Sequence, residues 1–154
     1  MNDILYATLD NVNVIKVYGK ATMKNSQAVL DLFENSDKIV MLDLSETTYI
    51  DSTFLGLIAK YTMEYMQKYS EYLSIIKPTD EVLTALKQTG ILKFIVIINE
   101  QITINGVKVE NNNFTNSNIP KHILEMHEIL AGLNEENAIV FNPVVEQLRK
   151  VVEK

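Results

Sequence analysis

Apolar residues recur along the first part of the chain with spacings that predict strands and helices. Residues 4–8 alternate between apolar and polar or small side chains, and Asn11 separates them from an apolar group at 12–17, a pattern typical of a β-hairpin. Apolar positions then follow helical spacing over 22–35. An unbroken apolar run within 38–44 predicts a strand that is buried on both faces.

The pattern continues as an alternation of helices and strands. The stretch from 52 to 70 carries an apolar stripe beside a charged face, which predicts the longest helix. A strand is predicted at 72–76, a helix from Thr79 to a stop at Gly90, and a final buried strand at 93–98. Strands and helices that alternate with short connections predict an α/β fold, with a mixed, mostly parallel sheet and flanking helices.

The pattern of apolar and polar residues changes after residue 98. We therefore predict a core domain at 1–98, a linker at 99–120 and a helical extension at 121–154. Within the linker, Asn105-Gly106 lies between alternating apolar residues, which favours a small hairpin. An asparagine-rich stretch follows it and is typical of a linker.

The extension has two apolar stripes of helical spacing, which separate near Gly132. Pro143 lies inside the second stripe, so this helix either kinks there or starts anew with Asn142 as its cap. Clustered aliphatic residues favour association, and the late stripe should therefore pack on the core, form a helical hairpin or join a second chain. We favour a homodimer through 121–154, because isologous pairing buries a self-complementary stripe.

Charge and composition disfavour several classes of partner. The chain has 154 residues, no cysteine, and 14 basic against 20 acidic residues, which gives a net charge of −6. Binding to nucleic acid or to an anionic membrane surface depends on Lys and Arg, so both are disfavoured. No apolar run is long enough to span a bilayer, and the first residues lack the pattern of a signal peptide. We expect a cytoplasmic protein.

Ser52 is the candidate functional residue, because it follows a buried strand and opens the longest predicted helix. Backbone N–H groups and the positive end of the helix dipole at such a position favour a phosphate group. Alternatively, Asp51 or Ser52 could simply cap the helix. Thr53 is a weaker candidate for the same modification. Phe54 is either a docking anchor for a partner or a core residue.

The residues of an enzyme are not expected. The chain lacks cysteine, has no G-x-S-x-G sequence around Ser52, and its five glycines form no phosphate-binding loop. His122 and His127 are five residues apart, about 140° around a helix, and so do not share a face as metal ligands. We expect both to be ordinary helix residues, and we expect no catalytic residue, no metal and no cofactor.

The sequence I-V-M-L-D-L at 39–44, followed by Y-I-D-S-T at 49–53, resembles the STAS domain, named after sulphate transporters and anti-sigma factor antagonists. In that family a strand ending in L-D-L leads to a D-S-[ST]-G motif that opens a helix. Phe54 stands where the family has glycine, and Gly56 comes two positions late. The resemblance extends over residues 3–98 and implies a STAS-like fold.

The resemblance also implies a function. In anti-sigma factor antagonists, the serine of this motif is phosphorylated by a partner that is both anti-sigma factor and serine kinase. Ser52 would then be the phosphoacceptor, a phosphatase would reverse the modification, and the unphosphorylated protein would sequester the anti-sigma factor in bacterial transcription control. The implied partner contacts are Asp51, Thr53, Phe54 and Gly56. The alternative is a STAS-like scaffold or oligomerisation module without a switch.

Overall fold

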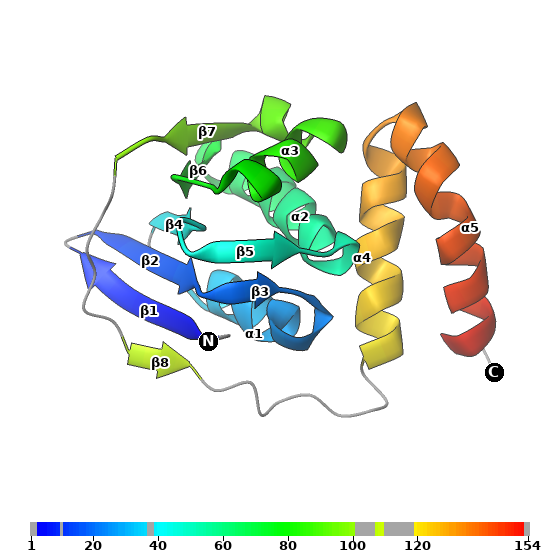
Figure 1. Cartoon of the computed structure of the whole chain (residues 1–154), viewed down its shortest axis with the longest axis horizontal. Coiled ribbons are helices and arrows are strands. Elements are labelled where there is room, and N and C mark those ends of the chain that lie inside the picture. The colour runs from blue at the N-terminus through cyan, green and yellow to red at the C-terminus, as the bar shows by residue number, and fades with distance from the viewer. Residues whose placement is uncertain (1–2, 10, 37–38, 101–106, 110–118, 153–154) are drawn as a thin grey trace.

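The structure of the chain is a computed structural model. The residues whose positions it describes are 3–9, 11–36, 39–100, 107–109 and 119–152. Within these segments the strands form one larger sheet and one short two-stranded sheet. Figure 1 shows helices packed against the sheets and a pair of C-terminal helices at one end of the molecule.

The larger sheet has a parallel centre. Its strands, in spatial order, are β7 (Ile95–Ile98), β6 (Leu73–Ile76), β4 (Ile39–Asp43), β2 (Val12–Val17), β1 (Ile4–Leu9) and β8 (Val107–Val109). Neighbours from β7 to β2 are parallel, whereas β1 runs antiparallel to both β2 and β8. The hairpin predicted at the start of the chain forms, with Tyr6 opposite Ile15. The predicted α/β class with a mostly parallel sheet is confirmed.

Most helices start and end where the sequence provides signals. They are α1 (Met23–Glu34), α2 (Ser52–Tyr69), α3 (Asp80–Gln88), the short 3-10 helix η1 (Ile91–Phe94), α4 (Ile119–Leu133) and α5 (Glu135–Val152). Thr22 caps α1 by accepting from the backbone N–H of Lys24. Gly90, just after α3, has a φ of 82°, which glycine adopts without strain. Of the helices in the described part of the chain, none is long and apolar enough to cross a membrane.

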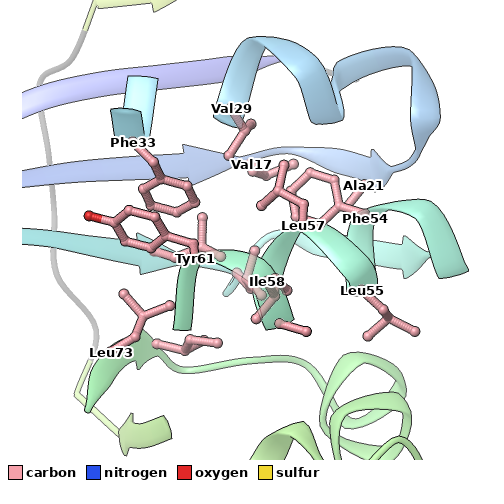
Figure 2. Packing of buried hydrophobic residues seen from close by; sticks show 14 of the residues in the cluster. Val17, Ala21, Val29, Phe33, Phe54, Leu55, Leu57, Ile58, Tyr61 and Leu73 are labelled. Carbon is pink, nitrogen blue, oxygen red and sulfur yellow. The ribbon is translucent and has the colours of Figure 1, made fainter. Parts of the chain in front are cut away.

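The core lies between the larger sheet and the helices α1 and α2, which pack side by side against one of its faces (Figure 1). Figure 2 shows the rings of Phe33 and Tyr61 stacked between these helices, with centroids 3.7 Å apart. Phe54 is 0% exposed and packs in the same cluster as Ala21 and Leu57. Phe54 is thus a core residue, and the structure does not present it as the exposed docking anchor that the sequence also allowed.

The core domain departs from the predictions at three places. Residues 91–94 form η1, so the last strand begins at Ile95 and not at Lys93. β3 (Gly19–Ala21) and β5 (Thr47–Ile50), which apolar periodicity did not predict, pair as a short parallel ladder. Thr79 is the N-cap residue of α3, as its position in the sequence predicts, but its hydroxyl donates to the carbonyl of Thr47 and its side chain caps no N–H of the helix. The second and third departures depend on contacts between segments that are far apart in the sequence.

The C-terminal helices pack on the core domain. α4 lies against α2, and α5 packs against α4 as its hairpin partner (Figure 1). Met126 and Leu130 of α4 belong to the same buried cluster as the residues of α2. Of the three predicted ways to bury the late apolar stripe, the structure shows the helical hairpin, in which α5 packs on α4 and buries Val145. Val140, Val144 and Val151 of the same stripe stay exposed.

The turn between α4 and α5 falls at Asn134. Its side chain accepts from the backbone N–H of Asn137 and donates to the carbonyl of Thr89, and the Asn137 side chain donates to the same carbonyl. These bonds fasten the turn of the hairpin to the end of α3. α5 then continues through Pro143, so the predicted alternative of a new helix start at Asn142 is wrong.

The segment after residue 98 also contributes a strand to the larger sheet. β8 pairs antiparallel with β1, placing Val109 opposite Ile4, and covers the edge that β1 would otherwise expose. The Asn105-Gly106 pair, where a small hairpin was predicted, lies outside the described residues, as does the asparagine-rich stretch.

Candidate functional site

Asp51 holds the starts of two helices together. As the N-cap of α2, it accepts from the backbone N–H of Phe54 through Oδ1, at 2.8 Å. Its Oδ2 accepts from the backbone N–H of Met23, the first residue of α1, at 2.9 Å. A carboxylate at the N-terminus of a helix is favoured by the helix dipole, and here two dipoles act on it. The cap of α2 is therefore Asp51, and the hydroxyl of Ser52 is left for another partner.

That partner is a histidine from α4. The Oγ of Ser52 lies 2.7 Å from Nε2 of His127, and Nδ1 of the same ring lies 2.7 Å from the carbonyl oxygen of Ile123. Because a carbonyl oxygen can only accept, Nδ1 carries a proton. In the neutral ring, Nε2 then accepts the hydroxyl hydrogen of Ser52.

A second serine–histidine pair lies one helix away. The Oγ of Ser26, in α1, is 2.6 Å from Nε2 of His122, and both side chains are buried. Burial, which penalises the charged imidazolium, lowers the pKa of His122 below its usual value. Both histidines lie in a helix, as expected, and each also forms a hydrogen bond to a serine of the core domain, a contact that the sequence did not predict. The available signal was the placement of His127 within an apolar stripe, where a polar side chain needs a partner.

Gly56 allows α4 to approach α2 closely. A Cβ built on Gly56 would come within 2.2 Å of the carbonyl oxygen of Met126 and within 2.7 Å of the Met126 Cβ. Side chains do not approach backbone atoms so closely, and so only glycine fits beneath α4 as the helices are now packed. In this structure Gly56 contacts a helix of its own chain.

Most of the residues that the sequence assigned to a partner surface are buried, in the core or beneath α4. Thr53 is 3% exposed, Phe54 is wholly buried and Gly56 lies beneath Met126, whereas Asp51 and Ser52 are half-buried. The assigned residues do lie together at the start of α2, but only Asp51 and Ser52 reach the surface. The open surface expected from the motif is absent here, because the apolar side chains of α4 are buried against α2.

Charged side chains border this contact. Lys60 of α2 pairs with Glu125 of α4 and, at 3.7 Å, with Glu34 of α1. Burial alone would lower the pKa of Lys60, but the hydrogen bond to Glu125 and the charges of the glutamates raise it above its usual value. Partly exposed pairs of this kind contribute little energy to stability.

The site consists of a serine hydroxyl that is hydrogen-bonded to a histidine, and it has the features of neither a metal centre nor a complete hydrolase triad. In the part of the chain that the structure describes, no group of three or more His, Cys, Asp or Glu side chains could hold a metal ion. Ser52 and His127 have the spacing of a serine and its general base, but Nδ1 of His127 faces a backbone carbonyl where a triad has a carboxylate. His127 is also only 5% exposed, so a substrate would have to displace α4 to reach it.

Comparison with known proteins shows which solved structures have a similar fold. No family model and no curated protein matches the chain. Among solved structures, the crystal structure of TM1081 from Thermotoga maritima, described as a "putative anti-sigma factor antagonist", is 19% identical with a TM-score of 0.55. The match covers 63% of this chain and 86% of that chain. An NMR structure of TM1081 matches at 22% identity and a TM-score of 0.52, over 61% of this chain and 78% of that chain.

A weaker match is the anti-sigma factor antagonist SpoIIAA in its unphosphorylated form, at 12% identity and a TM-score of 0.48, over 64% of this chain and 89% of that chain. Identities this low show the fold alone. The chain therefore has the STAS fold that its motif predicted. More than a third of the chain lies outside each of these matches.

Proposed function

We propose that this protein is a protein-binding module controlled by phosphorylation, and that Ser52 is its phosphoacceptor. The partner is an anti-sigma factor that is also a serine kinase, and a phosphatase restores the free hydroxyl. One observation carries the proposal. The hydroxyl of Ser52 lies in the first turn of α2, is not used as the helix cap, and is part of a fold that the chain shares with TM1081. The protein would act in bacterial transcription control, in the cytoplasm.

The start of α2 suits a phosphate group and an electrostatic switch. The helix dipole and the free backbone N–H groups of a first turn favour an anion. Phosphorylation adds about −1.5 to −2 charges, here beside Asp51 and on a protein of net charge −6. Within an interface, such a charge is costly to desolvate and is repelled by the neighbouring carboxylate. The phosphorylated protein would therefore release its partner.

The proposal is tested by incubating the protein with a candidate kinase and ATP, and by measuring the intact mass. We expect Ser52→Ala to stay folded, to gain no phosphate and to bind the partner constitutively, whereas Ser52→Asp binds more weakly. Thr53→Val is the matched control, and it should still gain one phosphate because Thr53 is buried. Undiminished phosphate incorporation in Ser52→Ala would overturn the proposal.

We further propose that the chain has no catalytic activity of its own and works without a cofactor. Ser52 and His127 are engaged with each other, and His127 is buried under its own helix. Hydrolysis of ATP or of an activated ester by the purified chain, if abolished in both Ser52→Ala and His127→Gln, would show that the pair is catalytic and would contradict this view.

A second candidate function, oligomerisation without a switch, is favoured by the outer face of α5. Ile139 and Val140 are 78% and 61% exposed, and Val144 and Val151 are also exposed. Such a row of aliphatic side chains on one helix is typical of an interaction surface. The occupant that we propose is a second copy of the chain.

The charges of α5 support pairing of two copies in antiparallel orientation. The helix begins with Glu135 and Glu136 and ends with Arg149 and Lys150. A two-fold axis near Asn142 would place each acidic start beside a basic end. The same axis would place Val140 of each copy opposite Val144 of the other.

Light scattering tests this pairing. The full chain should have the mass of a dimer, and Val140→Asp should convert it to a monomer. Lys121→Asp, at an exposed position of α4, is the charge-changing control and should leave the dimer intact. A monomeric full chain at tens of micromolar would exclude oligomerisation through α5.

A further inference from the structure

Helix α4 occupies the face of α2 that carries Ser52. We infer that this face is a helix-docking surface and that α4 is its displaceable cover, so that a kinase or partner reaches Ser52 only after α4 has left. The biological consequence rests on the proposed function of Ser52. The cover itself can be tested without any kinase or partner.

The covered face runs along one side of α2. Ser52, Gly56 and Lys60 are four residues apart, so they lie one above another on the helix. Each contacts α4, through the imidazole of His127, the backbone of Met126 and the carboxylate of Glu125 respectively. The face thus combines the hydroxyl of Ser52, a notch at Gly56, where α2 has no side chain, and the ammonium group of Lys60. Helix α4 packs against this face.

The notch makes this surface selective for a closely packed helix. Because Gly56 has no side chain, the backbone of α4 at Met126 can lie directly on α2. The neighbouring side chains of Leu55 and Ala59 are buried. A loop or a flat surface would leave the notch empty, so the kind of partner that fits this face in place of α4 is another amphipathic helix.

The cover blocks the approach of a kinase. A kinase must bring the γ-phosphate of ATP in line with the acceptor hydroxyl, and Oγ of Ser52 is already hydrogen-bonded to His127. One turn further along α2, Gly56 lies beneath Met126 as well. The chain segment around Ser52 therefore cannot enter an active site while α4 is in place.

The contact between α4 and the core domain combines apolar and polar side chains, as is typical of interfaces that can separate. Around the apolar Met126 and Leu130 it uses side-chain bonds that water or a partner can replace, namely Ser52–His127, Ser26–His122 and Lys60–Glu125. Contacts of mixed polarity between parts of one chain permit relative motion. At the other end of α4, Asn134 and Asn137 stay fastened to Thr89, which provides a fixed point about which the Ser52 end can separate.

Thiol labelling tests the cover, because the chain has no cysteine of its own. The experiment measures the maleimide reaction rate of the full-length variant Ser52→Cys and of two reference variants. The rate of each variant is expressed relative to its own rate in denaturant. The exposed reference is Thr48→Cys and the buried reference is Ala21→Cys. Ser52→Cys should react at least about tenfold more slowly than Thr48→Cys. Equal rates for these two variants would overturn the inference.

A second substitution then removes the cover. Met126→Asp places a charge in the buried contact and leaves α2 unchanged. Combined with Ser52→Cys, it should raise the labelling rate at least about tenfold, whereas the rates of Thr48→Cys and Ala21→Cys should not change. If the rate at position 52 stays low, or if Ala21→Cys becomes reactive together with it, α4 does not act as a separable cover and the inference fails.

A phosphorylation assay distinguishes a failure of the cover by α4 from a failure of the proposed phosphoacceptor role of Ser52. With a candidate kinase and ATP, Met126→Asp should accept phosphate on Ser52 at least about tenfold faster than the unmodified chain. If thiol labelling shows the cover but neither protein gains phosphate, the proposed function fails and the cover stands. If both proteins gain phosphate at the same rate, α4 does not control access and the inference fails.

Discussion

The backbone of Met126 in α4 lies directly over Gly56 in α2, so close that a Cβ on Gly56 would be 2.2 Å from the Met126 carbonyl oxygen. Gly56→Ala should therefore lower the free energy of unfolding, by about 1–3 kcal/mol as for other overpacked contacts. This would occur although alanine is the better helix former by about 1 kcal/mol. Urea denaturation measures the change.

Gly132 provides the matched control, since it lies in α4 and a Cβ there would meet nothing within 4 Å. Gly132→Ala should leave stability unchanged or raise it by up to about 1 kcal/mol, through helix propensity alone. If the two alanine variants behave alike, α4 does not pack on Gly56 as described.

The two serine–histidine pairs predict a specific pattern of energetic coupling. Ser52→Ala and His127→Gln should each cost about 1–2 kcal/mol, with a coupling of roughly 1 kcal/mol between them, as expected for a partly buried hydrogen bond. A double-mutant cycle by urea denaturation measures this coupling. The Ser26–His122 cycle should give a similar value.

The crossed combination is the control for these cycles. Ser52 and His122 belong to different pairs, so their substitutions should be additive within about 0.5 kcal/mol. A crossed coupling as large as the paired ones would mean that the variants disturb α4 as a whole and do not report on single bonds.

Stability should decline at acidic pH because of His122. Its pKa in the folded protein is lowered, chiefly by burial and also by Lys60, while the nearby carboxylates of Glu125, Asp31 and Asp51 act in the opposite direction. The unfolded chain therefore binds a proton more readily than the folded one. The contribution of the neutral imidazole is complete above the ordinary value of 6.5 and is lost as the pH falls through the lower folded pKa.

The measurement compares unfolding free energies of the unmodified chain and of His122→Gln between pH 7.5 and pH 5. Glutamine keeps a hydrogen-bonding group for Ser26 but does not titrate in this range. The unmodified chain should lose stability more steeply than the variant as the pH falls. Parallel curves for the two proteins would show that His122 is not the group responsible.

A chain that ends at Asn99 tests the predicted boundary of the core domain. Such a chain lacks β8, α4 and α5. It should remain folded but be less stable, because α2 loses its apolar contact with α4 and β1 becomes an edge strand. Circular dichroism and light scattering would show a folded monomer, compared with a dimer for the full chain. If the shortened chain is unfolded, α4 and β8 are parts of the core and the boundary is misplaced.

Local patterns were sufficient to predict most elements and the position of Ser52. The apolar run of β4 and the amphipathic stripe of α2 are both visible in the sequence, and the D-S-T motif lies at the start of α2, directly after the short strand β5. Asp51 proved to be the cap, a choice that local sequence left open between two neighbours with similar propensity.

The cover over Ser52 could not be predicted, because it depends on where a helix from the end of the chain docks. Ser52 and His127 are 75 residues apart, and Ser26 and His122 are 96 apart. Periodicity shows that α4 has an apolar face, but not which surface buries it. The notch at Gly56 is likewise visible only once the backbone of Met126 lies against it.

Strand β8 has a consequence for any competitor of α4. Val109 at its end is anchored on β1, and α4 begins at Ile119, only ten residues further along the chain (119 − 109 = 10). Short tethers hold a ligand at a local concentration on the order of millimolar. The local concentration of α4 is then roughly a thousandfold higher than that of a free competitor helix at about 1 µM. Such a helix must bind α2 about a thousandfold more tightly than α4 does to occupy half of the protein molecules. The anchoring strand would thereby set a threshold, so that only a tight or abundant partner engages the face that carries Ser52.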